Sequence, residues 1–283
     1  MYSIKLEYII DENYEEVRLD KFIRKKYKAL PLSLIYNMIR KGQIKVNHKK
    51  SKENYRLIKG DLVFIYSEEE NKVKFIELSN KEYEIVKKSI VYDNNGIVII
   101  NKEPELVVHK GTNHDYGLLE MLKSYYKTDE FAFINRIDKS TSGLVIAGKD
   151  NKTVRELSKL IREDKIKRFY YVKVKGNVNE NEFIIKNYID RTETTSIISE
   201  NGKESITKFK LIKKEKNYSV LEAELITGRT HQIRVQLSSI ELPIFGDYKY
   251  GYKQGEIMCL FSHKIIIENG ITIDLEIPKY FYE

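Results

Sequence analysis

The segment Asn135-Arg136-Ile137-Asp138-Lys139-Ser140-Thr141-Ser142-Gly143 is polar and leads directly into the apolar run Leu144-Val145-Ile146-Ala147. A short apolar run that follows turn residues is typical of a buried strand. The polar segment can be interpreted simply as a hairpin loop whose Asp and Ser side chains bond to turn amides. A carboxylate on such a loop can also be held ionised and oriented by an Arg from elsewhere in the chain. Asp138 is then a candidate nucleophile that requires neither a metal nor a cofactor.

A second polar cluster, Thr227-Gly228-Arg229-Thr230-His231-Gln232-Ile233-Arg234, follows the strand-like run Ser219–Ile226. Its plain structural interpretation is a helix start, with Thr230 as the N-cap and Arg234 on a solvated face. In the alternative interpretation, Arg234 approaches the carboxylate of Asp138. Spacing along the chain does not decide whether the two clusters meet.

The region around both clusters predicts more strand than helix. Because the strand-like runs come mostly in adjacent pairs, an antiparallel α+β domain is favoured over a parallel βαβ arrangement. The expected helices are Leu118–Tyr126, Thr153–Ile161 and His231–Ile240. The expected strands are Gly96–Ile100, Leu144–Ala147, Tyr170–Val174, Phe183–Ile189, Thr207–Ile212, Ser219–Ile226, Ile265–Ile267 and Ile271–Ile277.

The sequence of 283 residues lacks the motifs of several common metal and cofactor sites. A single Cys excludes a disulfide framework and a Cys-based zinc site, and the five His form no H-E-x-x-H pair, so we expect no metal. Glycine-rich dinucleotide and P-loop motifs are missing as well, so we expect no cofactor. Without a long apolar run or an apolar leader, we expect no membrane association and a cytoplasmic location.

Positive charge is concentrated near the N-terminus. The net charge is +8, but Arg18–Lys59 holds 14 Lys and Arg against 2 acids, a net +12, which leaves −4 for the other 241 residues. A charge run is often only a solvated face. This run, however, carries two apolar stripes at helical spacing, and the second is bounded by Ser33 as N-cap and Gly42 as C-cap.

A folded basic face of this kind can contact several phosphates and give salt-dependent affinity for RNA or DNA. The segment resembles the small alpha-L RNA-binding motif of ribosomal proteins and RNA-modifying enzymes over Arg18–Phe22, Ser33–Gly42, Ile44–Asn47 and Lys59–Asp61. The resemblance implies a structured RNA as partner. The expected RNA-docking residues are Arg18, Lys21, Arg24, Lys25, Arg40 and Lys41.

The two polar clusters resemble the signatures of RluA-type pseudouridine synthases. Arg136–Leu144 is similar to the catalytic loop of that family, and Thr227–Arg234 is similar to its second signature. Three further segments also resemble family segments. They are Asn101-Lys102 with Pro104 and Val107-Val108-His109, then Arg168–Gly176, and finally Pro243–Gly251. Together with the two clusters, these five matches occur in the same order as in the family. Five ordered matches are far more specific than any single one.

The resemblance implies a cofactor-free isomerisation of uridine to pseudouridine. It makes Asp138 the nucleophile or the carboxylate that assists glycosidic cleavage, with attack at C1′, attack at C6 and deprotonation at C2′ all open. It pairs Arg234 with that Asp and stacks Tyr170 on the base. It also implies four substrate-binding residues. Arg136 would fill the space that the target uridine leaves when it flips out of the stack, and Ile233 would pack near the base. Arg229 and Lys102 would contact phosphates.

Each of these roles has a structural alternative. Tyr170 can be an ordinary aromatic of an alternating strand, Ile233 a core residue, and Arg229 and Lys102 exposed surface charges. Three positions also depart from the family pattern, because Asn135, Gln236 and Phe261 stand where the family usually has His. They put the roles of those histidines in doubt.

Two other functions stay open from the sequence. A non-catalytic RNA-binding protein would use the same basic module. A glycoside or nucleoside hydrolase would use Asp138 with a second carboxylate, for which Asp247 is available.

The expected architecture is α+β, in two domains. Residues 1–80 form an alpha-L RNA-binding domain and linker, with its basic core at 18–66, and residues 81–283 form a mixed, mainly antiparallel-sheet pseudouridine synthase catalytic domain. The polar stretch from Glu68 to Lys88 is interpreted as the linker. We expect a monomer acting on RNA, with large-subunit ribosomal RNA favoured over transfer RNA by analogy with the family.

Overall fold

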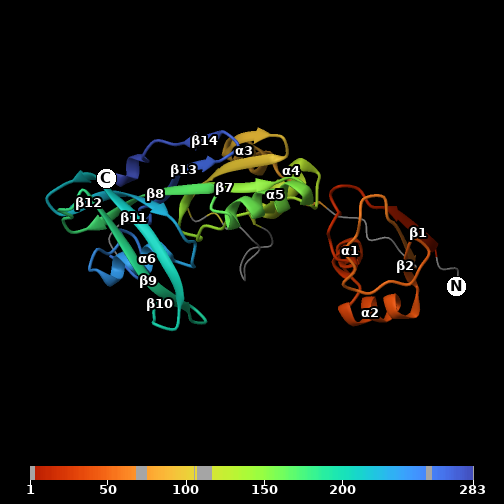
Figure 1. Cartoon of the computed structure of the whole chain (residues 1–283). Helices are drawn as coiled ribbons and strands as arrows, with labels where there is room; N and C mark the ends of the chain where they lie inside the picture. The colour runs from red at the N-terminus through yellow and green to blue at the C-terminus, as the bar shows by residue number, and fades with distance from the viewer. Residues whose placement is uncertain (1–3, 68–74, 105, 107–116, 253–256, 283) are drawn as a thin grey trace.

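The computed structural model describes residues 4–67, 75–104, 106, 117–252 and 257–282. These residues form a small N-terminal unit and a larger unit that lie end to end (Figure 1). Helices and mainly antiparallel sheets confirm the predicted α+β class. The predicted domain boundary after residue 80 stays a prediction, while linker residues 68–74 and the segment Val107-Val108-His109 lie outside the described residues.

The small unit packs two helices with a three-stranded sheet. Its strands pair antiparallel in the order β1 (Ile4–Ile9), β3 (Leu62–Ser67), β2 (Ile44–Val46). Helices α1 (Leu19–Lys26) and α2 (Leu32–Lys41) bury their apolar stripes in one cluster with the sheet. Strand β1 was not predicted.

The ends of α2 show one prediction confirmed and one wrong. Gly42 ends the helix in the left-handed conformation, with φ of 76°, as expected of a glycine C-cap. The predicted N-cap Ser33 instead lies inside the helix, because Pro31 has the cap position and its carbonyl accepts the first helical hydrogen bonds, from the amides of Leu34 and Ile35.

The larger unit is built on an eleven-stranded sheet in the order β10-β9-β11-β12-β8-β13-β7-β5-β4, with β14 beside β13 and β6 beside β7. Its paired strands run antiparallel except β7 and β13, which are parallel. The strands are β4 (Ile90–Asn94), β5 (Ile97–Lys102), β6 (Ala132–Phe133), β7 (Ser142–Gly148), β8 (Ile166–Lys175), β9 (Glu182–Arg191), β10 (Ser196–Ile198), β11 (Lys203–Lys214), β12 (Tyr218–Leu225), β13 (Leu260–Ile267) and β14 (Ile271–Asp274).

Strand β7 is buried along its whole length. Val145 and Ala147 belong to one hydrophobic cluster, and the alternate residues Leu144 and Ile146 belong to another. This alternation means that β7 is covered on both faces. The polar loop that precedes β7 therefore starts from a rigid base.

Helix bounds agree with the sequence where an apolar stripe is present. Helix α4 (Leu118–Tyr126) has the predicted bounds, and α5 (Asn151–Arg162) and α6 (Gln232–Ser239) differ from prediction by one or two residues at their ends. Short 3-10 helix η1 (Lys279–Phe281) lies near the C-terminal end of the described residues.

Helix α3 (Asn80–Ser89) occupies part of the stretch predicted to be a linker. It starts with a capping box, in which the Ser79 hydroxyl accepts from the Glu82 amide and the Glu82 carboxylate accepts from the Ser79 amide. Its buried residues are Val86 and Ser89, so its sequence shows little apolar periodicity.

The two units contact each other through polar groups. The Arg155 guanidinium donates to the backbone carbonyls of Asn13 and Glu12, at 2.7 and 2.8 Å. The carboxylate of Glu12 also pairs with Lys152 at 2.8 Å. A loop of the small unit is thereby tied to helix α5 of the larger unit.

The C-terminal side of α1 makes a second interdomain contact. Lys28 pairs with Asp129 at 2.9 Å, and the Lys25 ammonium donates to the side chain of Asn151 at 2.9 Å. Part of the basic surface predicted for RNA docking therefore faces the larger unit.

The start of β7 requires glycine. Gly143 has φ of +102°, and a Cβ there would lie 2.2 Å from the backbone oxygen of Ser262 on β13. Gly143→Ala should lower the free energy of unfolding by well over the roughly 1–2 kcal/mol of left-handed strain alone. Gly270→Ala is the matched control, because Gly270 has φ of +93° but a Cβ there would meet no atom within 4 Å beyond its chain neighbours. Equal losses of thermal stability in the two variants would contradict the close approach of β7 to β13.

Candidate active site

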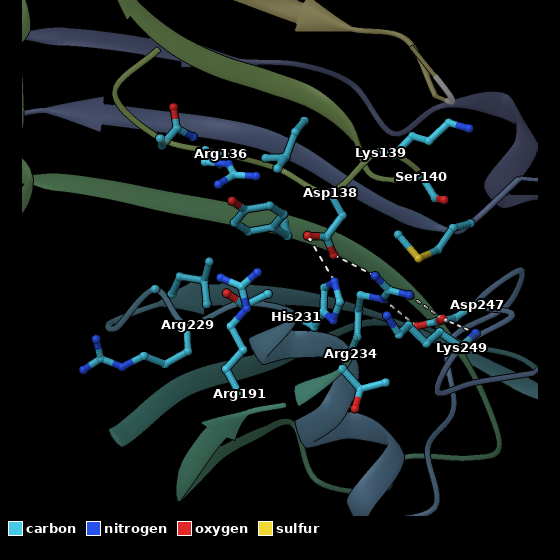
Figure 2. Close-up of a pocket in the computed structure, with 18 of the residues that line it drawn as sticks. Arg136, Asp138, Lys139, Ser140, Arg191, Arg229, His231, Arg234, Asp247 and Lys249 are labelled. Carbon is cyan, nitrogen blue, oxygen red and sulfur yellow. Dashed lines mark hydrogen bonds and ion pairs between the residues drawn. The ribbon is translucent and has the colours of Figure 1, made fainter. Parts of the chain in front are cut away.

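A cavity of about 1110 Å³ lies between the loop before β7 and the start of α6. This volume is slightly above the range of roughly 300–1,000 Å³ found for small-molecule sites. Residues of both polar clusters line it, so the structure brings the two clusters together. Figure 2 shows Asp138 directed at Arg234 and His231 inside this cavity.

Backbone contacts fix the loop that carries Asp138. The side-chain oxygen of Asn135 accepts from the buried amide of Ile146 at 2.7 Å, which ties the start of the loop to β7. The ammonium of Lys102 donates to the carbonyl of Lys139 at 2.8 Å. The loop is thus held on both sides of Asp138.

Gln232 fixes the turn that carries the second cluster. Its side-chain oxygen accepts from the Thr227 hydroxyl at 2.9 Å and from the Arg229 amide at 3.0 Å. Its side-chain nitrogen donates to the Ile206 carbonyl at 3.1 Å and to the Thr207 hydroxyl at 2.8 Å. The first turn of α6, and Arg234 within it, is thereby anchored to β11.

The predicted N-cap Thr230 is wrong. Helix α6 begins at Gln232, and His231 occupies the cap position in the left-handed conformation, with φ of 55°. No described side chain caps the first turn of α6; the side chain of Gln232 instead accepts from the Arg229 amide in the turn before the helix.

One guanidinium connects two carboxylates at the centre of the site. Nε and Nη2 of Arg234 donate to Oδ2 and Oδ1 of Asp247 at 2.8 and 2.7 Å, and Nη1 donates to Oδ2 of Asp138 at 2.8 Å. A bidentate pair fixes the plane of a guanidinium. Asp247 therefore orients Arg234, and Arg234 orients Asp138.

Arg234 and Asp247 each stabilise the charged form of the other, although both are buried. Burial alone would lower the pKa of Arg234 and raise that of Asp247, but the hydrogen bonds between them outweigh it, so the pKa of Arg234 is raised and that of Asp247 is lowered. Both groups stay charged at neutral pH. The side chain of Asp247 is 0% exposed whereas that of Asp138 is 28% exposed, so Asp138 is the carboxylate within reach of a ligand.

Tyr170 and Ile233 lie behind this centre. Both are buried in the same hydrophobic cluster, and burial raises the pKa of Tyr170, so its phenol stays neutral. Tyr170 also lines the cavity. Ile233 belongs to the core and is not among the described residues that line the cavity.

The cavity lining is strongly cationic. Among its described residues, Asp138, Glu193 and Asp247 are the carboxylates, against seven cationic side chains. Arg136 and Arg229 were predicted from the family resemblance, and both are exposed. The seven cations are Arg136, Lys139, Arg168, Arg191, Arg229, Arg234 and Lys249 (Figure 2 labels all but Arg168).

Arg168, Arg191 and Lys249 were not predicted as site residues. Arg191 ends β9 and belongs to no motif in the sequence, whereas Lys249 lies in a turn within the matching segment Pro243–Gly251, which did not single it out. The signal for Arg168 was its place two residues before Tyr170, on the same face of β8.

Lys102 does not have the surroundings expected of a phosphate ligand. It is 0% exposed, and its ammonium donates to the carbonyls of Glu103, Leu106 and Lys139 at 3.0, 3.2 and 2.8 Å. This enclosure argues against the predicted phosphate contact, and the bond to Lys139 shows Lys102 supporting the loop that carries Asp138.

The predicted RNA-docking residues of the small unit divide into two groups. Arg18 pairs with Asp20 at 2.7 Å, and Lys25 faces the larger unit. The exposed members are Lys21, Arg24, Arg40 and Lys41.

The three departures from the family pattern have structural surroundings. Asn135 bonds to β7 as described above, and Phe261 is buried in a hydrophobic cluster. Gln236 accepts from the Thr207 hydroxyl at 2.6 Å and donates to the side chain of Asn187 at 3.1 Å. None of these contacts involves the Asp138–Arg234 pair.

In the described part of the chain, no group of three or more His, Cys, Asp or Glu is arranged to hold a metal ion. No helix there is long and apolar enough to cross a membrane.

Arg234→Gln should make stability depend on pH in a defined way. In the wild type the lowered pKa of Asp247 contributes stability above its unfolded value of about 3.9, and this contribution is lost as the pH falls through the folded value. Without the cation, burial raises that pKa instead, so the ionised carboxylate destabilises the variant at neutral pH by about 3–5 kcal/mol.

Thermal unfolding should therefore show a large gap between wild type and Arg234→Gln at about pH 7 and a smaller one at about pH 4. Arg229→Gln, an exposed cation of the same cavity, serves as control and should change little. A gap of constant size would mean that Arg234 does not stabilise the ionised form of Asp247.

Comparison with known proteins agrees with this geometry. Residues 96–239 match the family model described as RNA pseudouridylate synthase, and residues 17–63 match the S4 domain, the alpha-L motif. The chain is 36% identical over 253 residues to ribosomal large subunit pseudouridine synthase C of Buchnera aphidicola subsp. Baizongia pistaciae, covering 87% of this chain and 80% of that one. It is 34% identical over 249 residues to the protein of the same name from Vibrio parahaemolyticus, covering 86% and 79%.

Solved structures share the fold. Human RNA pseudouridylate synthase domain containing 1 matches with a TM-score of 0.58 at 23% identity, over 66% of this chain and 82% of that chain. Human RNA pseudouridylate synthase domain containing 4 matches with a TM-score of 0.59 at 18% identity, over 71% and 94%. With a family model spanning half of its length and relatives above 30% identity, the chain belongs to the RNA pseudouridylate synthase family of isomerases and carries an S4 domain before its catalytic domain.

Proposed function

We propose that this enzyme converts uridine to pseudouridine at defined positions of large-subunit ribosomal RNA, with Asp138 as its catalytic carboxylate and without a cofactor. The names of the relatives from Buchnera and Vibrio support this substrate. The observation that carries the catalytic part is the 2.8 Å hydrogen bond from Arg234 to Asp138 inside a cation-lined cavity.

The reaction has modest chemical requirements. The C1′–N1 bond breaks, the uracil turns, and C1′ joins C5, while the proton lost from C5 balances the one gained at N1. No electrons leave the substrate, so no redox partner is needed. One oriented, ionised carboxylate next to the ribose can assist the cleavage, either as a nucleophile at C1′ or C6 or as a base at C2′.

Arg234 and Tyr170 suit the two neighbouring tasks. Arg234 holds Oδ2 of Asp138, whose side chain is 28% exposed, so the carboxylate is oriented and still within reach of the substrate. Tyr170 lines the same cavity as a neutral aromatic ring, a surface on which uracil can stack. Because burial raises the pKa of Tyr170, the phenol keeps its proton and can donate it.

RNA would enter through the cationic lining. A uridine within a helix is out of reach until it leaves the stack, and Arg136 is exposed two residues before Asp138, which suits it to the vacated space. Arg191, Arg229 and Lys249 line the same cavity and can neutralise flanking phosphates.

The rival hydrolase function has weaker support. It would need Asp247 as an acid–base partner, yet both oxygens of Asp247 accept hydrogen bonds from Arg234 and its side chain is 0% exposed. A non-catalytic role in RNA binding is less compatible with the oriented Asp138–Arg234 pair.

Asp138→Asn should abolish isomerisation and leave RNA affinity within about twofold, because the amide keeps the shape of the carboxylate but lacks its charge. Release of tritium from uridine labelled at C5 measures the reaction, since C5 loses its hydrogen when C1′ joins it. Glu193→Gln, another carboxylate of the cavity lining, is the matched control and should retain activity. Turnover by Asp138→Asn at the wild-type rate would disprove the assignment.

The S4 domain should contribute separable phosphate contacts. Arg40→Ala and Lys41→Ala, at exposed positions, should each reduce the slope of log affinity against log salt by about 1. Lys28→Ala is the control, because Lys28 pairs with Asp129 of the larger unit, and its slope should match the wild type. Filter-binding titrations in which all three variants keep the wild-type slope would show that RNA does not dock at the end of α2.

A further inference from the structure

His231 faces the second oxygen of the catalytic carboxylate. Its Nε2 lies 3.7 Å from Oδ1 of Asp138, while Arg234 binds Oδ2. The residue has φ of 55°, a left-handed conformation that is uncommon outside glycine and carries strain of order 1 kcal/mol. The backbone thus directs this ring at Asp138 from the cap position of α6.

The other nitrogen of His231 is held by Tyr250. The distance from Nδ1 to the Tyr250 hydroxyl is 2.7 Å. Tyr250 is itself fixed, because its amide donates to Asp247 at 3.2 Å and its carbonyl accepts from the Ser238 hydroxyl at 2.6 Å. Its ring also lies 5.1 Å from the guanidinium carbon of Arg234.

The hydrogen of the Tyr250 hydroxyl can be assigned from its neighbours. The backbone amide of Ser196 lies 2.6 Å from the hydroxyl oxygen, and a backbone amide can only donate. The hydroxyl accepts that bond, and among the described residues Nδ1 of His231 is the partner that its own hydrogen can reach. Nδ1 is therefore an acceptor, and in neutral imidazole the proton is then on Nε2.

We propose that Tyr250 locks His231 in the Nε2–H tautomer, so that His231 is a positioning donor facing Oδ1 of Asp138 and not a general base. This inference rests on the proposed catalytic role of Asp138. Arg234 holds Oδ2 by a 2.8 Å hydrogen bond, and Nε2 of His231 faces Oδ1 at 3.7 Å, which is longer than a hydrogen bond, so the ring acts on Oδ1 through the direction of its N–H dipole. An Nε2 that already carries a proton cannot accept one from the substrate.

The charged surroundings are compatible with a neutral ring. Burial lowers the pKa of His231, and Asp138 opposes this shift. The other charged groups around the ring are Arg234 on its own helix and Lys249 and Asp247 on the following loop, of which the two cations also lower the pKa. At neutral pH the ring is uncharged, as the tautomer assignment requires.

The lock also involves the hairpin between β9 and β10. The Ser196 hydroxyl donates to the carbonyl of Thr230 at 2.8 Å, next to His231, and the ammonium of Lys249 donates to the carbonyl of Thr194. Thr194 and Thr195 line the cavity. The segment that orients Tyr250 is thus one that a bound RNA would touch.

Two isosteric variants separate the two ring nitrogens. His231→Gln places an amide N–H near the position of Nε2, facing Asp138, whereas His231→Asn keeps a polar group only near the position of Nδ1. We expect kcat of His231→Asn to fall about tenfold or more, kcat of His231→Gln to exceed it at least fivefold, and KM to change little in either. Asn and Gln with equal kcat would overturn the donor role.

Nitrogen chemical shifts of ¹⁵N-labelled histidine test the lock independently of catalysis. In the wild-type protein at about pH 8 the His231 signals, identified by their loss in His231→Gln, should show a protonated Nε2 and an unprotonated Nδ1. Tyr250→Phe removes only a hydroxyl, and it should produce a mixture of tautomers, raise the pKa of His231 and lower kcat about fivefold.

A wild-type signal with the proton on Nδ1, or a Tyr250→Phe variant with an unchanged tautomer, would overturn the proposal. These measurements need no substrate, so they stand apart from the proposed function. That function fails instead if the wild-type enzyme forms no pseudouridine in large-subunit ribosomal RNA.

Discussion

The site depends on one guanidinium that is shared by two carboxylates. Arg234 is fixed by a bidentate contact with the fully buried Asp247, and its remaining Nη1 then fixes Asp138. Such a charge arrangement would be unfavourable in a loosely packed site, because each buried charge needs its partner. The rest of the larger unit supplies that rigidity: β7 is buried on both faces and supports the Asp138 loop, while Gln232 ties the start of α6 to β11.

Positive charge is placed locally in both units. Residues 18–59 carry a net +12, whereas residues 81–283 carry only +3 in total, so the overall charge of the catalytic unit gives it little attraction for RNA. It instead concentrates cations around the cavity, where they outnumber carboxylates seven to three. The S4 domain provides exposed cations at Arg40 and Lys41, while Lys25 and Lys28 hold it against the catalytic unit. Part of the basic surface that the sequence suggested for RNA therefore holds the two units together.

The sequence predicted the central pair but not its surroundings. Asp138, Tyr170 and Arg234 came from ordered motifs, and the strands around them from apolar alternation. What failed depends on contacts between distant residues. Lysine is usually an exposed residue, so the sequence does not indicate that Lys102 is buried with its ammonium bound to three carbonyls. The helix at Asn80–Ser89 has a polar composition with little apolar periodicity, so it was not predicted. The chain from Ser196 through Tyr250 to His231 joins residues up to 54 positions apart, so no spacing rule reveals it.

The central claim is that an oriented Asp138 isomerises uridines of large-subunit ribosomal RNA. Mapping every pseudouridine in that RNA, from cells with and without this chain, tests the claim most directly. The account predicts that one or a few pseudouridines disappear without the protein and return with the wild-type chain. Identical maps from both kinds of cell would contradict it.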